Sequence, residues 1–417
     1  MQYNYVYSDA DKDIATILDL PKTWDVTVVG NLTKQRLATE DIIVRLSDKV
    51  MASACNKKSA CIIVDDSSRP TPANVIVTHI VTCLHDTGIR DENIFFVVSH
   101  GTHAPDSETM MRSKIGEAMH ERFKVIPHDC RNDCVQLGIS SNGIPVSVNK
   151  HVYEADLRIG VSCVVPHPAA GFSGGNKIVA PGVCGYETIR ALHDECRGCK
   201  QRAGKIETEF RATINEIAGM VGLDLSANVI INSKREIVEL FCGDPESSFK
   251  EAVKYVRSHH SVKLPRAVDL LIIDTYPCDR TVNLAMDRAF WPLFHYGTAT
   301  EKVVLAECRD GMGGHELFST KQPFMQRLKR RLAHFSTKEM LCLPERVFNI
   351  VKMLRKFSVR FSVISSVLRD EELQRSFKNA TVIRAWDDFA SDFMKRRGRR
   401  RIRVVIVRSA PLVYQGK

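Results

Sequence analysis

Short apolar runs alternate with amphipathic stretches along most of this chain. The apolar runs have the length of buried strands, whereas the stretches between them carry apolar residues at helical spacing. Runs that we expect to form strands are 59–66, 93–99, 123–127, 155–162, 270–274, 302–306, 360–364 and 403–407. Stretches that we expect to form helices are 73–84, 107–119, 210–221, 247–256, 285–294 and 322–333. This alternation predicts an α/β protein with parallel-type sheets and helices on both faces.

The length of the chain predicts two domains, because 417 residues exceed what one ordinary hydrophobic core supports. The weakest patterning lies at 258–265, in the run Ser-His-His-Ser-Val-Lys-Leu-Pro. We therefore place an N-terminal α/β domain at 1–263 and a C-terminal α/β domain at 266–417. The last residues are allowed to pack back on the first domain.

Composition narrows the class of protein. A content of 44% hydrophobic and 26% charged residues is ordinary for a globular protein, and no stretch is apolar for the length of a membrane span. The first residues show no basic patch followed by an apolar run, so we expect no secretory signal. The 13 cysteines are odd in number and scattered, which favours reduced thiols and a cytoplasmic location over a disulfide framework.

The net charge of +10 gathers partly at 329–331 and at 395–403. Such basic clusters can bind nucleic acid or acidic surfaces. Aromatic residues make up only 7% of the chain and are not interleaved with these cations, unlike in a surface that stacks bases. We therefore interpret the clusters as solvated basic faces and expect no nucleic-acid partner.

The segment 166–193 carries two histidines and a lysine around a glycine-rich turn. His167 precedes the turn, Lys177 follows it, and His193 closes the segment. Histidines beside such a turn add a proton carrier or a metal ligand near neutral pH. The alternative is a tight loop between strand and helix, with histidines that bond only to backbone.

The turn itself suits an anion such as phosphate. Gly174 and Gly175 allow backbone angles that other residues avoid and let the main chain approach a ligand, while Ser173 adds a hydroxyl.

A second polar cluster follows the strand expected at 59–66 and opens the next helix. Its members are Asp66, Ser67, Ser68, Arg69 and Thr71. Hydroxyls and helix N-terminal amides can cradle a phosphate, and an arginine can clamp it through two parallel hydrogen bonds. The alternative is a capped helix with a surface arginine.

Two histidines follow the strand expected at 93–99, in the run Ser-His-Gly-Thr-His-Ala-Pro. A histidine at the carboxyl end of a strand is well placed to act as a general base in a cleft. His103 is the preferred candidate and His100 the competing one. A histidine that merely caps the loop is the remaining alternative.

Together these three runs resemble the lactate racemase family, the nickel-pincer enzymes. The run at 166–193 is similar to the family's His-Pro…Phe-Ser-Gly-Gly-x-Lys…Pro-Gly…Thr-Ile…His pattern. The run at 65–72 is similar to Asp-Asp-x-Thr-Arg-Pro-Thr-Pro, and that at 99–105 looks like Gly-x-His-Arg. The resemblance implies two α/β domains with the active site in the cleft between them.

The resemblance also implies a cofactor, nickel pyridinium-3,5-bisthiocarboxylic acid mononucleotide. Lys177 would bond to it covalently, His193 would ligate the nickel, and the polar cluster at 66–71 and the glycine-rich turn would hold it. His103 and His167 would be two acid/base histidines. The implied reaction is racemisation or epimerisation of a small 2-hydroxy acid, in which a hydride passes to the cofactor and returns to the opposite face.

This sequence departs from the family pattern at two places. Ala104 stands where arginine is common after the histidine. In the second half, Ala285 and Met286 replace a tyrosine–glutamine pair, and Arg288 is the cation nearest to the family's lysine. We therefore expect a 2-hydroxy acid larger than lactate, packed on Met286 and paired with Arg288 through a carboxylate.

Two other functions stay open. A zinc-dependent hydrolase could use His103, His167 and His193 as metal ligands, and a cofactor-binding relative could lack racemase activity. The pair Cys196 and Cys199 has no second pair at matching spacing, so we expect no structural zinc there. The oligomeric state does not follow from the sequence.

Overall fold

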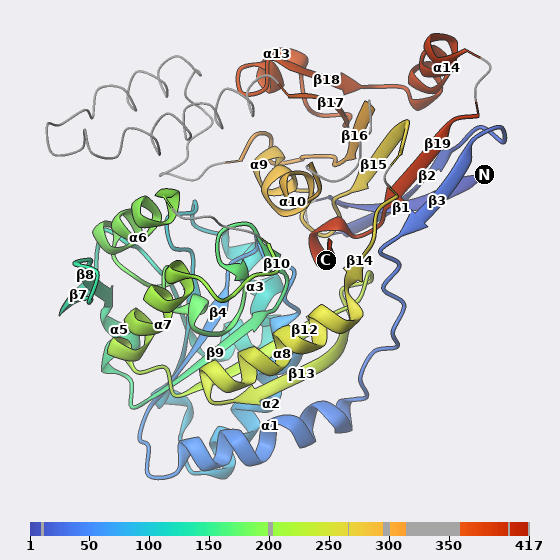
Figure 1. The fold of residues 1–417 in the computed structure, drawn as a ribbon. Coiled ribbons are helices and arrows are strands. Elements are labelled where there is room, and N and C mark those ends of the chain that lie inside the picture. The colour runs from blue at the N-terminus through green and yellow to red at the C-terminus, as the bar shows by residue number, and fades with distance from the viewer. Residues whose placement is uncertain are drawn as a thin grey trace, which may run out of the picture. The chain divides into compact units, whose positions relative to one another are not determined.

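The computed structural model describes residues 1–9, 12–198, 203–265, 267–294, 301–313, 359–398 and 401–415 (Figure 1). The chain divides into two compact units. The large unit comprises Leu32–Ser261 and Leu412–Lys417, and the small unit comprises Met1–Asn31 and Val262–Pro411. The helix expected at 322–333, the basic run at 329–331 and Cys199 lie outside the described residues.

The large unit is built on a six-stranded sheet. In spatial order its strands are β13 (Ile237–Gly243), β12 (Leu225–Ile231), β9 (Leu157–Cys163), β4 (Ala60–Asp65), β5 (Ile94–Ser99) and β6 (Lys124–Pro127). Neighbouring strands are parallel except β13, which is antiparallel to β12. Every residue of β4 is buried, which explains why this strand is a continuous apolar run in the sequence.

Helices cover both faces of this sheet (Figure 1). The helices are α1 (Thr39–Ala54) and α2 (Ala73–Asp86) on one face, and α5 (Lys150–Glu154) and α7 (Glu209–Val221) on the other, with α8 (Pro245–His259) packed over β12 and β13. Successive side chains of a strand point to opposite faces. Ile62 and Val64 accordingly pack in the core with α1 and α2, whereas Cys61 and Ile63 pack in the core with α5 and α7.

Shorter elements complete the large unit. They are α3 (Glu108–Ile115), α4 (Glu117–Arg122), the hairpin of β7 (Cys134–Ile139) and β8 (Pro145–Asn149), the hairpin of β10 (Pro166–His167) and β11 (Gly171–Phe172), the 3-10 helix η2 (Gly175–Ile178) and α6 (Tyr186–Gly198). The single helix expected at 107–119 is divided in two because Gly116 takes a φ of 96° between α3 and α4.

The small unit is built on a second six-stranded sheet, whose neighbouring strands are all parallel. Its order is β18 (Asn379–Ile383), β17 (Arg360–Ile364), β16 (Glu301–Leu305), β15 (Leu270–Asp274), β19 (Arg403–Val407) and β3 (Asp25–Val29). One face is covered by the hairpin of β1 (Gln2–Asp9) and β2 (Lys12–Asp19) and by α14 (Trp386–Arg397), whose apolar side chains share a core with β15 and β19.

The segment after β15 forms three short consecutive helices. These are α9 (Val282–Ala285), η3 (Met286–Phe290) and α10 (Trp291–Phe294). Phe290 packs on Phe361 of β17 with ring centroids 4.9 Å apart, which fixes these helices on the sheet. A further short helix, α13 (Asp370–Gln374), precedes β18.

The structure corrects the expected domain division at the amino terminus. Residues 1–31 belong to the small unit and not to an N-terminal domain at 1–263, because β3 pairs with β19 as the edge strand of the small unit's sheet. The other boundary falls at Ser261 and Val262, and the residues from Leu412 onward belong to the large unit.

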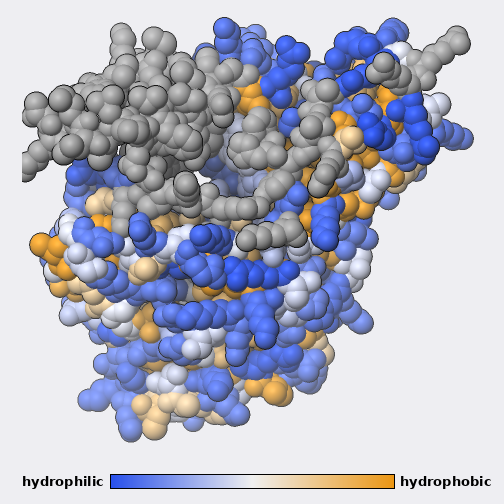
Figure 2. Space-filling model, in the orientation of Figure 1, coloured by the Kyte–Doolittle hydropathy of each residue, from blue (hydrophilic) through white to orange (hydrophobic). Residues whose placement is uncertain are grey.

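Ion pairs neutralise much of the basic segment at 395–403. Arg396 lies 2.8 Å from Asp392 and 3.2 Å from Glu301, and Arg401 lies 3.2 Å from Asp25. On the face that Figure 2 shows, hydrophilic residues cover most of the large unit, with apolar ones scattered between them. Among the described residues, no helix has both the length and the apolar character that crossing a membrane requires. The ion pairs of Arg396 and Arg401 are compatible with a solvated basic face, which stays a prediction.

Candidate active site

The three sequence motifs meet at the carboxyl edge of the large unit's sheet. β9, β4 and β5 are parallel neighbours, so the loops that follow them emerge side by side at one edge. Direct hydrogen bonds tie these loops together, from Cys163 N to Thr71 Oγ1 (2.9 Å) and from Gly101 N to Gly182 O (2.9 Å). Open α/β sheets bind their ligands at this edge. We therefore take it as the candidate site.

The central contact of the site joins Asp66 to His103. Asp66 Oδ2 accepts a hydrogen bond from His103 Nδ1, and Asp66 is only 3% exposed. Burial alone would raise the pKa of Asp66, but the His103 ring, Arg69 and the Ser68 hydroxyl hold it well below its ordinary value. The aspartate is therefore ionised and accepts hydrogen bonds only. Sequence reasoning placed both residues at the site but did not predict that they touch.

The cluster that was expected to hold a phosphate is largely bonded to itself. Ser68 Oγ donates to Asp66 Oδ1 (2.5 Å), and Arg69 Nη1 donates to Ser68 Oγ (2.7 Å). Thr71 Oγ1 donates to Asp65 Oδ2 (2.5 Å) while accepting from Cys163 N, so its single hydrogen is already used. Thr71 thus fixes the loop in place. Direct contact with a cofactor stays a prediction for the other members of the polar cluster at 66–71.

Two residues outside the predicted motif hold this loop, and sequence reasoning missed both. Asp106 accepts from Ser67 N (2.8 Å) and Ser67 Oγ (2.5 Å). Lys114 of α3 lies 2.7 Å from Asp65 Oδ1 and donates to the carbonyl oxygens of Arg69 (2.9 Å) and Thr71 (3.2 Å). A buried lysine with three acceptors on one loop is a positioning group. Its sequence signal was weak because Lys114 is one of many lysines on amphipathic helices.

The competing base candidate, His100, is buried and engaged. Its side chain is 2% exposed, and Nε2 accepts a hydrogen bond from the backbone N–H of Asp106 (3.0 Å). Asp106 is also the residue that binds Ser67. His100 therefore supports the loop geometry, whereas His103, which is more exposed, is better placed as the base.

The glycine-rich turn packs against protein more tightly than the sequence suggested. A Cβ on Gly174 (φ 87°) would lie 2.6 Å from Val164 Cγ2, and one on Gly175 (φ 56°) would lie 2.8 Å from Phe249. Ser173 Oγ donates to Cys163 O (2.7 Å) and accepts from Val165 N (3.0 Å). These residues shape the turn through packing and internal bonds. Their expected contact with the cofactor stays a prediction.

A buried arginine binds the backbone of this turn. Arg211 of α7 is 3% exposed and donates to the carbonyl oxygens of Ala170 (3.0 Å), Phe172 and Gly174 (3.4 Å). Burial lowers its pKa to about 9, and its guanidinium lies 4.4 Å from the ring centre of Phe249. Sequence reasoning did not identify Arg211, because an arginine on an amphipathic helix gives no sign of being turned inward.

The other predicted site residues are His167, His193 and Lys177, and the two histidine rings have different hydrogen-bond partners. His167 Nδ1 accepts from Ala169 N (3.1 Å) and Ala170 N (3.2 Å). His193 Nδ1 contacts Ile189 O at 2.7 Å, so it is the donor and the neutral ring has its lone pair on Nε2. Lys177 lies on η2, half-buried.

The donor set is compatible with a metal held mainly by an organic cofactor. In the neutral ring His193 has its lone pair on Nε2, which is the form in which a histidine ligates a metal ion. Among the described residues, no group of three or more His, Cys, Asp or Glu side chains is arranged to hold a metal ion by itself. The zinc-hydrolase alternative, which requires such a group, therefore gains no support from the described part of the chain.

The predicted substrate residues lie in the small unit. Met286 and Arg288 belong to η3, and Arg288 is only 5% exposed. In the same unit, Asp279 accepts hydrogen bonds from Ser8 N (2.7 Å) and Ser8 Oγ (2.9 Å) of the amino-terminal hairpin. The role of Arg288 and Met286 stays a prediction, as does the position of the site in a cleft between two domains.

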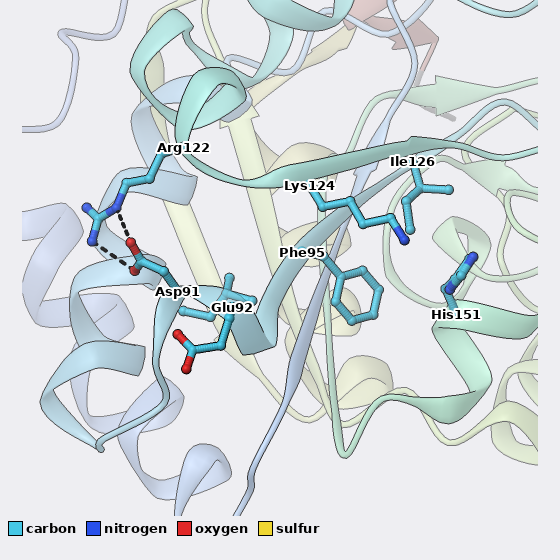
Figure 3. A pocket seen from close by; sticks show the side chains of 8 residues that line it. Asp91, Glu92, Phe95, Arg122, Lys124, Ile126 and His151 are labelled. Atoms are coloured by element: carbon cyan, nitrogen blue, oxygen red, sulfur yellow. Dashed lines mark hydrogen bonds and ion pairs between the residues drawn. The ribbon is translucent and has the colours of Figure 1, made fainter.

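A separate cavity of about 340 Å³ lies at the opposite edge of the large unit's sheet (Figure 3). Its walls include Phe95 near the start of β5, Lys124 at the start of β6, and His151 of α5. At its rim Arg122 Nε lies 2.6 Å from Asp91 Oδ2. Since the motif loops follow the other ends of these strands, the cavity is distinct from the candidate site.

Comparisons with known proteins agree with the motifs. Residues 18–204 match the family model described as the lactate racemase N-terminal domain. A lactate racemase from Thermoanaerobacterium thermosaccharolyticum is 26% identical over 303 residues, which cover 68% of this chain and 70% of that protein. A lactate racemase from Lactiplantibacillus plantarum is 29% identical over 286 residues, 65% of each protein.

Solved structures support the fold. The lactate racemase apoprotein from Thermoanaerobacterium thermosaccharolyticum matches all of this chain and all of its own with a TM-score of 0.74 at 20% identity. A protein of Thermotoga maritima matches 92% of this chain and 99% of its own, with a TM-score of 0.68 at 15% identity. The α/β fold with parallel sheets and the family resemblance that the motifs predicted are thereby confirmed.

Proposed function

Because this chain is a relative of the lactate racemases and carries their N-terminal domain, we propose that it is an isomerase that racemises or epimerises a 2-hydroxy acid. The observation that carries this proposal is the pair of the ionised Asp66 and His103 at the carboxyl edge of the sheet. Its neighbours there are the loop with His167 and Lys177.

The Asp66–His103 pair suits the removal of a hydroxyl proton. The carboxylate fixes the hydrogen of His103 on Nδ1, so Nε2 carries the lone pair in the neutral ring. When Nε2 takes the proton, the positive ring is stabilised by the buried negative charge. A 2-hydroxy acid must lose this proton as its carbon is oxidised, and must regain it when the hydride returns.

The cofactor that we propose is the nickel pincer mononucleotide. When bound, it supplies the hydride acceptor that side chains lack. Lys177 would hold it covalently, His193 Nε2 would ligate the nickel, and Ser67, Ser68, Arg69 and the glycine-rich turn would bind its nucleotide part. The fit rests on the fixed ring of His193 and on the packing that holds the turn in one conformation.

The substrate that we propose is a 2-hydroxy acid larger than lactate, contacted by Met286 and Arg288. A cytoplasmic location is proposed as well, since the cysteines are odd in number and scattered, which favours reduced thiols over a disulfide framework.

Cofactor-loaded protein incubated with single enantiomers of a set of 2-hydroxy acids tests the activity. We expect each enantiomer of one substrate to convert to a mixture, with chiral chromatography as the readout. Loaded protein that converts none of the 2-hydroxy acids would contradict the proposal and favour a cofactor-binding relative without activity.

The metal ligand can be tested in the same preparation. His193→Ala should lose nickel, because one missing ligand weakens the site, whereas His103→Gln should keep it. His259, an exposed histidine on α8, offers the matched control His259→Ala, which should keep nickel as well. Nickel that remains in His193→Ala at the level of the control would contradict the assignment.

A further inference from the structure

The 3-10 helix η2, which carries Lys177, is preceded by a glycine that cannot cap it. Gly174 occupies the N-cap position and has no side chain to accept a hydrogen bond. The backbone N–H of Gly175 instead donates to Asn228 Oδ1 of β12, at 2.8 Å. We propose that Asn228 is a positioning residue for Lys177: it caps η2 from a remote strand and thereby fixes the backbone from which Lys177 bonds to the cofactor. The role of Lys177 rests on the proposed function, whereas the capping bond does not.

A cap from another element is needed because this turn is buried and closely packed. The first N–H groups of a helix have no partner within it, and a buried N–H without an acceptor costs free energy. A capping side chain cannot stand at Gly174, since even a Cβ there would lie 2.6 Å from Val164 Cγ2 and 3.1 Å from Asn228 Oδ1. The acceptor for the buried Gly175 N–H therefore has to come from outside the turn, and Asn228, which is 0% exposed, supplies it.

The amide group of Asn228 can take only one orientation. Ser248 Oγ, at the start of α8, has two carbonyl acceptors, Asp244 O at 2.7 Å and Ser226 O at 3.5 Å, so its single hydrogen points to one of them. Toward Asn228 this hydroxyl can only accept, and Asn228 Nδ2 donates to it at 3.0 Å. The amide oxygen is thereby left for the N–H of Gly175. A side chain that is bonded at both ends in this way holds the start of η2 in place.

The residues on either side of Lys177 are held by other elements. Asn176 Nδ2 donates to Asn215 Oδ1 of α7, at 3.2 Å. Ile178 packs so closely on β9 that a Cβ on Gly160 would lie 2.7 Å from its Cγ2. Because these two contacts hold η2 on α7 and β9, we expect the loss of the cap to loosen the first residues of η2 while the sheet and its helices stay folded.

Four variants separate the cap from the packing around it. Asn228→Leu keeps the approximate size of the side chain and removes both of its hydrogen bonds, whereas Asn228→Asp keeps an acceptor for Gly175 N–H and is the conservative rescue. Ser248→Ala removes only the partner of the amide nitrogen and gives a milder change if Asn228→Leu does not fold. The matched control is Asn232→Leu, since Asn232 is also a buried asparagine of the large unit, 3% exposed, and bonds to Glu236 Oε2 at 2.8 Å.

Hydrogen exchange of the full chain without cofactor tests the cap directly. The N–H of Gly175 should exchange slowly in the natural chain, in Asn228→Asp and in Asn232→Leu, with overlapping peptides across η2 analysed by mass spectrometry as the readout. In Asn228→Leu it should exchange about 5–150-fold faster, the range for a buried donor left unpaired, and in Ser248→Ala the increase should be smaller. Exchange at the rate of the control in Asn228→Leu, or in Ser248→Ala if the leucine variant does not fold, would overturn the inference whether or not the protein is a racemase.

The rate of cofactor attachment tests the consequence for Lys177. Intact mass at equal loading times should show the adduct on the natural chain, on Asn228→Asp and on Asn232→Leu. In Asn228→Leu the adduct should form about 10–10²-fold more slowly, because a small misplacement of a reacting group has an effect of this size. An adduct that forms in Asn228→Leu as fast as in the control would show that Asn228 does not position Lys177, and would leave the proposed function intact. No adduct on the natural chain would contradict the attachment at Lys177 itself, and with it the positioning role.

Discussion

Two buried aspartates occupy similar places in the two units and are expected to differ in charge. Asp66 directly follows β4 in the large unit, and Asp274 ends β15 in the small unit; each is 3% exposed. The pKa of Asp66 is held low by His103 and Arg69. Burial instead raises the pKa of Asp274 to about 7, although Tyr3 Oη donates to it at 2.7 Å.

The pKa values of Asp66 and Asp274 differ because the residues around the two carboxylates differ, although both carboxylates lie at the ends of buried strands. The His103 ring, Arg69 and the Ser68 hydroxyl keep Asp66 charged, so it can stabilise a charged ring. At Asp274 burial outweighs Arg408 and the hydrogen bonds from Tyr3 and Tyr276, and the bond from Tyr3 Oη ties β1 to the sheet. Asp66 is thus paired with the proposed base His103, whereas Asp274 at the corresponding place in the small unit bonds Tyr3 of β1.

Removing the charge of Asp66 should have the largest effect. Asp66→Asn keeps the size of the side chain but removes the negative charge that stabilises a protonated His103, so kcat should fall about 10²–10⁴-fold. The control is Asp41→Asn on the exposed face of α1, which should leave turnover unchanged. Turnover of Asp66→Asn at the level of this control would contradict the paired role of Asp66 and His103.

Asp274 should make the stability of the small unit depend on pH. Its pKa is about 7 when folded and about 3.9 when unfolded, so the folded unit holds one more proton between these values. Its stabilising contribution is complete below about pH 4 and is lost progressively as the pH rises toward 7. Asp66, whose folded pKa is lowered, contributes in the opposite direction: its stabilisation is present above about pH 3.9 and is lost as the pH falls.

The chain offers a convenient probe for this test. All 3 tryptophans, Trp24, Trp291 and Trp386, belong to the small unit, so urea unfolding followed by tryptophan fluorescence reports on that unit. Asp274→Asn should flatten the pH dependence between pH 4 and 7, whereas Asp387→Asn, an exposed position on α14, should not. An unchanged slope in Asp274→Asn would assign the pH dependence to another group.

Arg288 tests whether the small unit contributes to the substrate site. If its guanidinium binds the substrate carboxylate, Arg288→Ala should weaken substrate binding by about 1.5–3 kcal/mol, the value for a hydrogen bond to a charged group. Competition between lactate and larger 2-hydroxy acids gives the preference of the enzyme. Fastest turnover on lactate, unaffected by Arg288→Ala, would refute both the size preference and the role of Arg288.

The glycine-rich turn should be sensitive to a single methyl group. Gly174→Ala places a Cβ 2.6 Å from Val164 Cγ2 at a positive φ, and should destabilise the large unit by about 1–3 kcal/mol. In Gly219→Ala, on α7, the added Cβ meets nothing within 4 Å and should stabilise by about 0.5–1 kcal/mol. Thermal unfolding by far-ultraviolet circular dichroism measures both, and equal Tm values would show that the turn adapts.

The periodicity of apolar residues predicted the helices and strands whose own sequence shows whether they are helical or extended. The apolar run at 270–274 is β15 and that at 403–407 is β19, because a strand buried on both faces needs a continuous apolar sequence. The amino-terminal hairpin was not predicted, since its partners Asp274 and Asp279 are remote in the sequence. For the same reason the domain assignment of residues 1–31 was wrong.

The sequence likewise predicted one part of the candidate site and not the other. The motifs identified which loops lie at the carboxyl edge, because each motif directly follows an expected strand and the carboxyl ends of parallel strands lie at one edge of a sheet. They did not reveal that Ser173 and Thr71 bond within the protein, nor that Lys114 and Arg211 are turned inward. Such roles depend on which side chains meet after folding, and residue type alone does not encode them.

The proposed covalent attachment of the cofactor at Lys177 can be tested most directly. Intact-mass analysis of protein loaded in a host that makes the cofactor should show an adduct on the natural chain. Lys205→Ala, an exposed lysine before α7, should keep this adduct, whereas Lys177→Ala and Lys177→Arg should show only the mass of the polypeptide. An adduct that persists in Lys177→Ala, or none on the natural chain after loading, would contradict the assignment of the large unit as the cofactor-binding part of a racemase.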